Sequence, residues 1–129
     1  MHYLKVKHFP QLRHPNIIDL YGYSSDNPDE PCLIYPFLRH TLAQRLAKNN
    51  ELPPLTARER LNISFGIAKA INHIHQQEIV ENGKRKVLVH RDIKPQNILL
   101  DDKLEAKVTE APEINKAQRL YRNYICQLV

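Results

Sequence analysis

Residues 90–97 read His-Arg-Asp-Ile-Lys-Pro-Gln-Asn and place three chemically useful side chains close together in the chain. Asp92 supplies a carboxylate that can accept a proton from a hydroxyl, and Lys94 supplies a cation that can balance charge on a transferring group. Asn97 supplies an amide oxygen, which suits a divalent metal ion. Phosphoryl transfer needs these three functions together. The alternative interpretation is an accidental charged turn between two strands.

The same residues match the His-Arg-Asp-x-x-x-x-Asn catalytic loop, so this part of the sequence resembles the protein kinases. Lys94 followed by Pro95 is similar to the serine/threonine branch of the family, and residues 97–101 continue the loop as the family does. The resemblance implies that Asp92 is the catalytic base, that Lys94 balances charge on the phosphoryl group and that Asn97 binds the metal.

A narrower resemblance joins the sequence to the interleukin-1-receptor-associated kinase and Pelle family. Tyr35 stands at the gatekeeper position, where tyrosine is unusual outside this group. The resemblance covers about residues 2–110, which correspond to the middle of a kinase domain. The segments that carry it are His14-Pro15-Asn16-Ile17, Asp19-Leu20, Gly22-Tyr23-Ser24-Ser25, Cys32-Leu33-Ile34-Tyr35 and the stretch from Pro54 to His75.

This resemblance implies an α+β fold class and, within it, a partial protein-kinase fold over residues 1–110. That fold would comprise the end of the N-lobe, the hinge and the first half of the C-lobe. The expected parts are an N-lobe remnant at 1–35, a hinge at 36–40, the start of the C-lobe at 41–110 with the catalytic loop at 90–97, and a divergent tail at 111–129.

The family's nucleotide site implies further residues in this chain. The hinge backbone around Phe37 and Leu38, beside the gatekeeper Tyr35, would bind the adenine of ATP, and Leu99 would lie against the ring from below. The alternative for Tyr35, Phe37 and Leu38 is an ordinary core position at the end of a strand. Binding of ATP and Mg²⁺ by this chain is expected to be weak or absent.

The sequence also departs from the pattern of a working kinase. A glycine-rich loop and a strand lysine would lie upstream of Met1, and no acidic residue precedes Asp19 to serve as the helix glutamate. Residues 110–112 read Glu-Ala-Pro where the family has Asp-Phe-Gly, so Mg²⁺ would be held by Asn97 and Glu110. In another register, residues 111–113 are the Ala-Pro-Glu that closes the activation segment, with the residues between deleted. Both registers stay open.

Local patterns predict the elements around these residues. Thr56 and Glu59 form a capping box that starts a long helix, in which one apolar stripe runs through Leu61 and Phe65 and another through Ile63 and Ile74. This helix is expected to be buried. The other predicted elements are a hairpin of strands at 17–23 and 32–35 with an unpaired edge, a helix at 41–47, a charged loop at 78–86 turning at Asn82-Gly83, strands at 87–89, 98–100 and 106–109, and a final helix at 114–128.

Composition restricts the class of protein. The 129 residues, of which 42% are hydrophobic and 26% charged, suit one globular domain. No apolar run is long enough for a membrane span, and the polar start is not a secretory signal, so a cytoplasmic protein is expected. Cys32 and Cys126 are too few and too far apart for a disulfide framework. The net charge of +5 includes residues 84–86, but aromatic residues are not interleaved with these charges, so no nucleic-acid partner is expected.

Two classes of function remain open. The first is a serine/threonine kinase-family domain that performs ATP-dependent phosphoryl transfer in receptor-proximal signalling of the Toll and interleukin-1 type. This chain would then be inactive as a fragment, splice product or incomplete gene model. The second is a pseudokinase-like scaffold or interaction fragment without catalysis. The expected partners are ATP and protein substrates or signalling adaptors.

Overall fold

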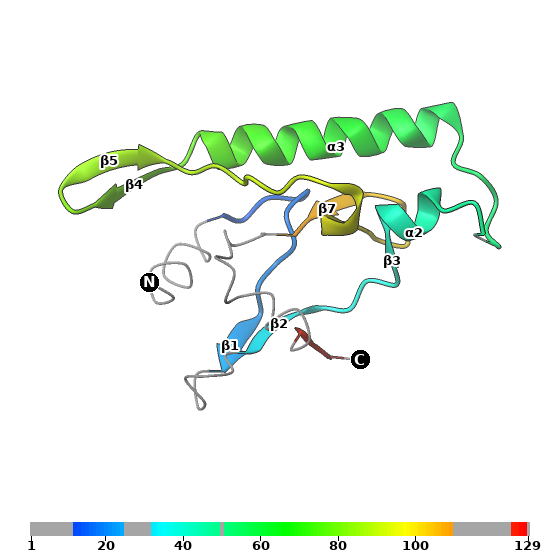
Figure 1. The fold of residues 1–129 in the computed structure, drawn as a ribbon, viewed down its shortest axis with the longest axis horizontal. Coiled ribbons are helices and arrows are strands. Elements are labelled where there is room, and N and C mark those ends of the chain that lie inside the picture. The colour runs from blue at the N-terminus through cyan, green and yellow to red at the C-terminus, as the bar shows by residue number, and fades with distance from the viewer. Residues whose placement is uncertain (1–11, 25–31, 50, 110–124, 129) are drawn as a thin grey trace.

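The computed structural model describes residues 12–24, 32–49, 51–109 and 125–128 of the chain. In Figure 1, α3 runs along one side of the molecule, the β4–β5 hairpin extends from its C-terminal end, and β1 and β2 lie on the opposite side. The helical elements are α2 (Leu42–Leu46), α3 (Ala57–His75) and the 3₁₀ helix η2 (Pro95–Asn97). The described strands form sheets of β1 (Gly22–Ser24), β2 (Cys32–Pro36) and β8 (Ile125–Leu128); of β3 (His40–Thr41), β6 (Ile98–Leu100) and β7 (Ala106–Val108); and of β4 (Glu78–Glu81) and β5 (Lys84–Val87). This mixture of helices and small sheets confirms the α+β class.

The start of α3 is the predicted capping box. The backbone N–H of Thr56 donates to Glu59 Oε2 at 2.7 Å, and the N–H of Glu59 donates to Thr56 Oγ1 at 3.2 Å. These bonds satisfy donors that the first helical turn leaves without partners, so the helix begins at Ala57. The same arrangement of Thr41 and Gln44 starts α2, which confirms the short helix predicted there.

Replacement of Thr56 by alanine is expected to lower the free energy of unfolding by about 1 kcal/mol, because the hydroxyl that accepts the N–H of Glu59 and donates to Glu59 Oε2 is lost. The backbone and side-chain hydrogen bonds from Thr56 also lower the pKa of Glu59. The contribution of Glu59 is therefore present above the ordinary pKa of a glutamate and is lost as the pH falls through the lowered pKa. Urea denaturation measures the change in the free energy of unfolding. The control variant Ser64→Ala, at an exposed position of the same helix, should change that free energy by no more than about 0.5 kcal/mol. Equal losses in the two variants would contradict a specific cap.

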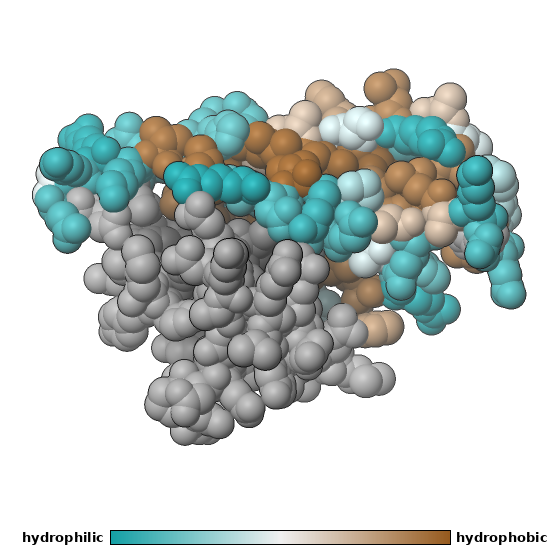
Figure 2. Space-filling view, viewed as in Figure 1, coloured by the Kyte–Doolittle hydropathy of each residue, from teal (hydrophilic) through white to brown (hydrophobic). Residues whose placement is uncertain are grey.

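The burial of α3 corrects the expectation of two buried stripes. Ile63 and Ile74 are buried, as are two small residues between them, Gly66 and Ala70. Leu61 and Phe65 are instead 69% and 61% exposed, so the stripe that they begin faces solvent. Apolar surface is visible along the part of the molecule where α3 runs (Figure 2). Sequence periodicity located the apolar positions correctly but could not show that the sheet covers only one face of the helix.

The core lies between α3 and the strands β6 and β7. Residues of β6 and β7 alternate between buried and half-buried, so each strand presents one face to the helix. Ile17 adds a side chain from the N-terminal segment through an isolated parallel bridge to Val108. The buried cluster comprises Ile17, Leu55, Ile63, Ala70, Ile74, Ile98, Leu100, Ala106 and Val108. This core fixes the strands that flank the 90–97 segment.

The predicted hairpin at 17–35 is present in a shorter form. Its first strand is β1 rather than the expected 17–23, and it pairs antiparallel with β2. The expectation of an unpaired edge is wrong for β2, because β8 pairs with it in parallel, with Leu33 opposite Ile125. The predicted final helix is wrong over 125–128, where the backbone forms this strand, and its residues 114–124 lie outside the described part of the chain.

Two further expectations need correction near the end of α3. Residues 78–86 were expected to be a charged loop, but β4 and β5 form an antiparallel hairpin that turns at Asn82-Gly83. Their positive φ angles of 52° and 73° suit the tight turn that joins the two strands. Of the strand expected at 87–89, only Val87 lies in a strand, as the last residue of β5. Charged residues have low strand propensity, so the pairing here depends on the turn and the backbone hydrogen bonds.

No helix among the described residues has both the length and the apolar character required to cross a bilayer.

Candidate active site

The segment 90–97 enters the core through η2 and β6. Pro95 occupies the first turn of η2, and the preceding Lys94 is extended, with φ −156° and ψ 159°, as expected for a residue before proline. The N–H of Asn97 donates to the carbonyl of Lys94 at 2.9 Å and closes the short turn. The next residue, Ile98, is buried in β6. Asn97 is therefore attached directly to the core.

His90 is a buried side chain with both ring nitrogens in contacts. Its Nδ1 accepts the backbone N–H of Asp92 at 3.2 Å, and its Nε2 lies 2.6 Å from the carbonyl oxygen of Thr109. Since Nδ1 accepts, the proton of the neutral ring lies on Nε2 and is donated to Thr109. Arg91 has φ 63°, and this left-handed turn brings the Asp92 N–H back toward the ring. His90 thus ties the loop to the end of β7.

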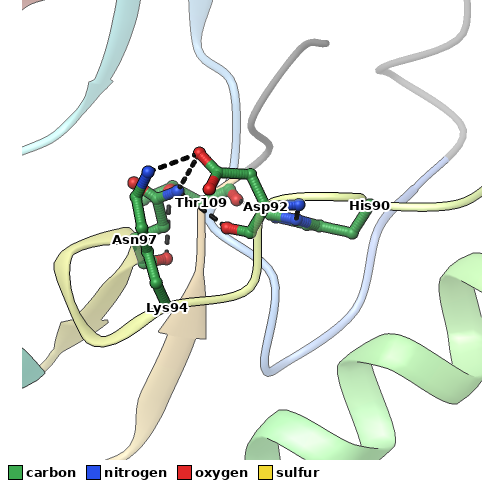
Figure 3. Close-up of polar contacts among 5 residues, drawn as sticks. All are labelled: His90, Asp92, Lys94, Asn97 and Thr109. Carbon is green, nitrogen blue, oxygen red and sulfur yellow. Dashed lines mark hydrogen bonds and ion pairs between the residues drawn. The ribbon is translucent and has the colours of Figure 1, made fainter.

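Asp92, Lys94 and Asn97 are brought together, as the sequence predicted (Figure 3). Lys94 Nζ donates to Asp92 Oδ2 at 2.7 Å, and Asn97 Nδ2 donates to the same oxygen at 2.9 Å. Asn97 Nδ2 also donates to the backbone carbonyl of Asp92 at 2.8 Å. These donors hold the carboxylate in one orientation. The side chain of Asp92 remains 43% exposed, so a substrate hydroxyl can reach it.

Thr109 contacts residues at both ends of the 90–97 segment, although its sequence pattern indicates only a place in a strand. Its N–H and its Oγ1 both donate to the carbonyl of Asn97, at 2.9 and 3.0 Å, while its own carbonyl accepts from His90. The indication that the sequence offers for these contacts is a residue with a hydroxyl group at the end of a predicted strand, immediately before Glu110. Thr109 therefore connects the two ends of the 90–97 segment.

The donor chemistry of this cluster suits Mg²⁺, which binds through oxygen ligands. Because the amide nitrogen of Asn97 faces Asp92, the amide oxygen is the atom of that side chain suited to a cation. Within the described ranges, no group of three His, Cys, Asp or Glu side chains is arranged to hold a metal. Glu110, the other expected ligand, lies outside the described residues.

The four expected nucleotide-site residues lie on β2, β6 and the connection that follows β2. Tyr35 is buried near the end of β2, Phe37 is exposed, and Leu38 is half-buried. Leu99 is half-buried on β6 and lies opposite Thr41 of β3. The connection from β2 to β3 thus leads from Tyr35 to the strand beside Leu99. Adenine binding at these residues stays a prediction.

Comparison of the sequence with known proteins identifies its family. The family described as "Protein kinase domain" matches residues 5–116 of the chain. The serine/threonine-protein kinase pelle of Drosophila melanogaster is 39% identical over 110 residues, which are 82% of this chain and 21% of that protein. The Arabidopsis thaliana receptor-like protein kinases HERK 1 and FERONIA are 33% and 34% identical over 106 and 107 residues, again 82% of this chain but 12% and 11% of theirs.

The chain spans about a fifth or less of the length of these relatives. The family match and the likeness to pelle confirm a partial protein-kinase fold and the predicted resemblance to the Pelle group. On these grounds the chain belongs to the protein kinase family.

Proposed function

We propose that this chain carries the catalytic-loop part of a serine/threonine kinase site, in which Asp92, Lys94 and Asn97 act on a substrate hydroxyl and a phosphoryl group from ATP. The observation that supports this most directly is the convergence of the Lys94 ammonium and the Asn97 amide on one carboxylate oxygen of Asp92. The printed name of the relative pelle, a serine/threonine-protein kinase, supports the substrate class.

Each side chain has a separate role in the proposed reaction. Asp92 orients the substrate hydroxyl and accepts its proton as the oxygen bonds to the γ-phosphorus of ATP and the bond from that phosphorus to the leaving ADP oxygen breaks. Lys94, 2.7 Å from Asp92 and 32% exposed, can turn toward the transferring phosphoryl group and offset its negative charge. Asn97 keeps its amide oxygen available for Mg²⁺, which when bound neutralises charge on the phosphates. His90 and Thr109 hold these groups in position.

ATP is the proposed phosphate donor. Its adenine would lie at the hinge backbone around Phe37 and Leu38, beside Tyr35, with Leu99 below the ring, and Glu110 would join Asn97 as a metal ligand. The proposed domain boundaries follow the same assignment, with the N-lobe remnant at 1–35, the hinge at 36–40, the C-lobe start at 41–110 and the tail at 111–129. The proposed partners are protein substrates or signalling adaptors. The proposed setting is cytoplasmic receptor-proximal signalling of the Toll and interleukin-1 type.

A second candidate function is a non-catalytic interaction module. It is favoured by the reading Glu-Ala-Pro at 110–112 in place of Asp-Phe-Gly, and by the lack of any acidic residue before Asp19. Glutamate is one methylene longer than aspartate, and phosphoryl transfer is sensitive to a displacement of about 1 Å. The 129-residue chain is for this reason expected to transfer no phosphate above the background of Asp92→Asn. Turnover by the purified chain that disappears in Asp92→Asn would contradict this expectation.

Binding of Mn²⁺ with ATP tests the proposed site independently of turnover. The free Mn²⁺ signal in electron paramagnetic resonance should reveal binding with a Kd in the millimolar range. A ligand present at a concentration equal to its Kd stabilises the folded chain by about 0.4 kcal/mol. Asn97→Ala should weaken binding at least about tenfold, because a ligand oxygen is lost, while the neighbouring Gln96→Ala should not. Equal affinities in these two variants would remove Asn97 from the metal site. Absence of binding in the unmodified chain would favour the interaction module.

A further inference from the structure

Residues 14–18 connect the N-terminal part of the described chain to β7 and α3. The N–H of Val108 donates to the carbonyl of Asn16 at 2.8 Å, and the N–H of Ile18 donates to the carbonyl of Val108 at 3.0 Å. Asn16 Nδ2 adds a bond to the carbonyl of Ala106 at 3.0 Å. This segment therefore braces the strand whose end carries Thr109 and, through it, the catalytic loop.

A pair of histidines lies between this segment and α3. The ring centroids of His14 and His73 are 4.9 Å apart, with the ring planes 32° from parallel. His14 Nδ1 accepts the backbone N–H of Asn16 at 3.0 Å, which requires that nitrogen to be unprotonated. His73 Nε2 is buried and has no hydrogen-bond partner in the described structure. The observed arrangement thus requires an unprotonated Nδ1 on His14.

The charged groups around the pair are mainly positive. Burial lowers the pKa of His14 most, and His73, Lys69 and Lys107 lower it further. Lys69 lies one turn before His73 on α3, with its ammonium over the ring of Phe65 at 4.4 Å. Lys107 of β7 also contacts the carbonyl of Pro15, and its Nζ lies 3.9 Å from a carboxylate oxygen of each of two acids, Asp101 and Glu105. The carboxylates of Asp101 and Glu105 therefore offset the positive charge of Lys107 rather than a charge on the histidine pair.

We propose that His14, packed against His73, forms an acid-sensitive latch that holds residues 14–18 against α3 at neutral pH and releases them when His14 is protonated. Protonation of His14 would place a positive charge against the ring of His73, close to Lys69 and Lys107, and would remove the acceptor that His14 Nδ1 offers to Asn16. The dipole at the C-terminal end of α3 favours a cation there, but it does not replace the lost hydrogen bond. The latch depends on this packing alone and does not require that the chain be catalytic.

The direction of the pH dependence follows from the lowered pKa of His14. The unfolded chain binds a proton at the ordinary histidine pKa, whereas the folded chain resists it until a lower pH. Stability from this contact is therefore present above the ordinary histidine pKa and is lost as the pH falls through the lowered one. Because residues 14–18 brace β7, release should also loosen Thr109 and its bonds to Asn97 and His90.

The test compares the unmodified chain with His73→Phe, which keeps an aromatic ring but cannot be protonated. Between about pH 7.5 and about pH 5.5, where histidine changes charge, the Tm of the unmodified chain should fall by about 4–8 °C more than that of His73→Phe. Protection of the Val108 amide against hydrogen exchange, corrected for the intrinsic exchange rate, should fall over the same pH range. His75→Phe, at an exposed position of the same helix turn, should behave as the unmodified chain does.

His14 still accepts its hydrogen bond from Asn16 in His73→Phe, so some acid sensitivity should remain in that variant. The same pH dependence in His73→Phe as in the unmodified chain would overturn the latch. Proton NMR titration of the unmodified chain tests it even if the variant does not fold. A pKa of His14 below the ordinary histidine value would support the proposal, and a pKa at or above that value would refute it.

Discussion

Replacement of Ile98 by alanine is expected to lower the free energy of unfolding by about 2–5 kcal/mol. Ile98 is 1% exposed and lies in the cluster formed by β6, β7 and α3, where the lost methyl and methylene groups would leave a cavity. Domains of this size are commonly stable by only about 5–15 kcal/mol. Ile98 also follows Asn97 directly, so the loss of packing should disorder the 90–97 segment as well.

The next residue on β6 provides the matched control for this experiment. Leu99 points to the other face of the strand and is half-buried, so Leu99→Ala should cost less than about 2 kcal/mol, because less apolar surface is removed from contact. Chemical denaturation of both variants gives the comparison. A loss for Leu99→Ala equal to or larger than that for Ile98→Ala would mean that α3 does not pack on the face of β6 described here.

Replacement of Gly66 by valine is the second change with a large expected effect. A Cβ at this position would lie 2.8 Å from Asn16 Nδ2 and 3.3 Å from Asn16 Cγ. Asn16 would have to move and would lose its bond to the carbonyl of Ala106. The expected cost is about 2 kcal/mol for overpacking and about 1 kcal/mol for the hydrogen bond.

A double-mutant cycle shows whether contact with Asn16 is the cause. In the Asn16→Ala background the obstructing amide is absent, and Gly66→Ala should stabilise α3 by up to about 1 kcal/mol through helix propensity. In the unmodified chain the same Gly66→Ala change should destabilise or be neutral. The same sign and size of effect in both backgrounds would show that Gly66 is required for some other reason.

The sequence predicted the elements whose determinants are local. The start of α3 follows from the capping box at Thr56 and Glu59, which satisfies backbone donors within one turn. The gathering of Asp92, Lys94 and Asn97 was predicted by spacing and by the resemblance to the kinase loop. Pro95 contributes by forcing Lys94 into an extended backbone that leads into a short turn.

The features that the sequence did not predict depend on contacts between distant residues. Nothing near His73 in the chain indicates that His14 packs on it, since the contact requires residues 14–18 to lie across α3. The role of Thr109 depends on the pairing of β6 with β7, which places its N–H and hydroxyl beside the carbonyl of Asn97. The strand at 125–128 was mistaken for a helix because its apolar spacing fits both, and its pairing with β2 decides the matter.

The β4–β5 hairpin has a practical consequence for labelling this protein. A Cβ added at Gly83 would meet no atom within 4 Å, and Asn82 and Gly83 are both exposed at the tip. The hairpin lies at the opposite end of α3 from α2 (Figure 1), whose neighbours include η2. Because Gly83 has a φ of 73°, which L side chains rarely adopt, a fluorophore or spin label is better attached at the neighbouring exposed residue Lys84 than at Gly83 itself. A probe placed there would follow the tumbling of the chain without touching the residues proposed to act on phosphate.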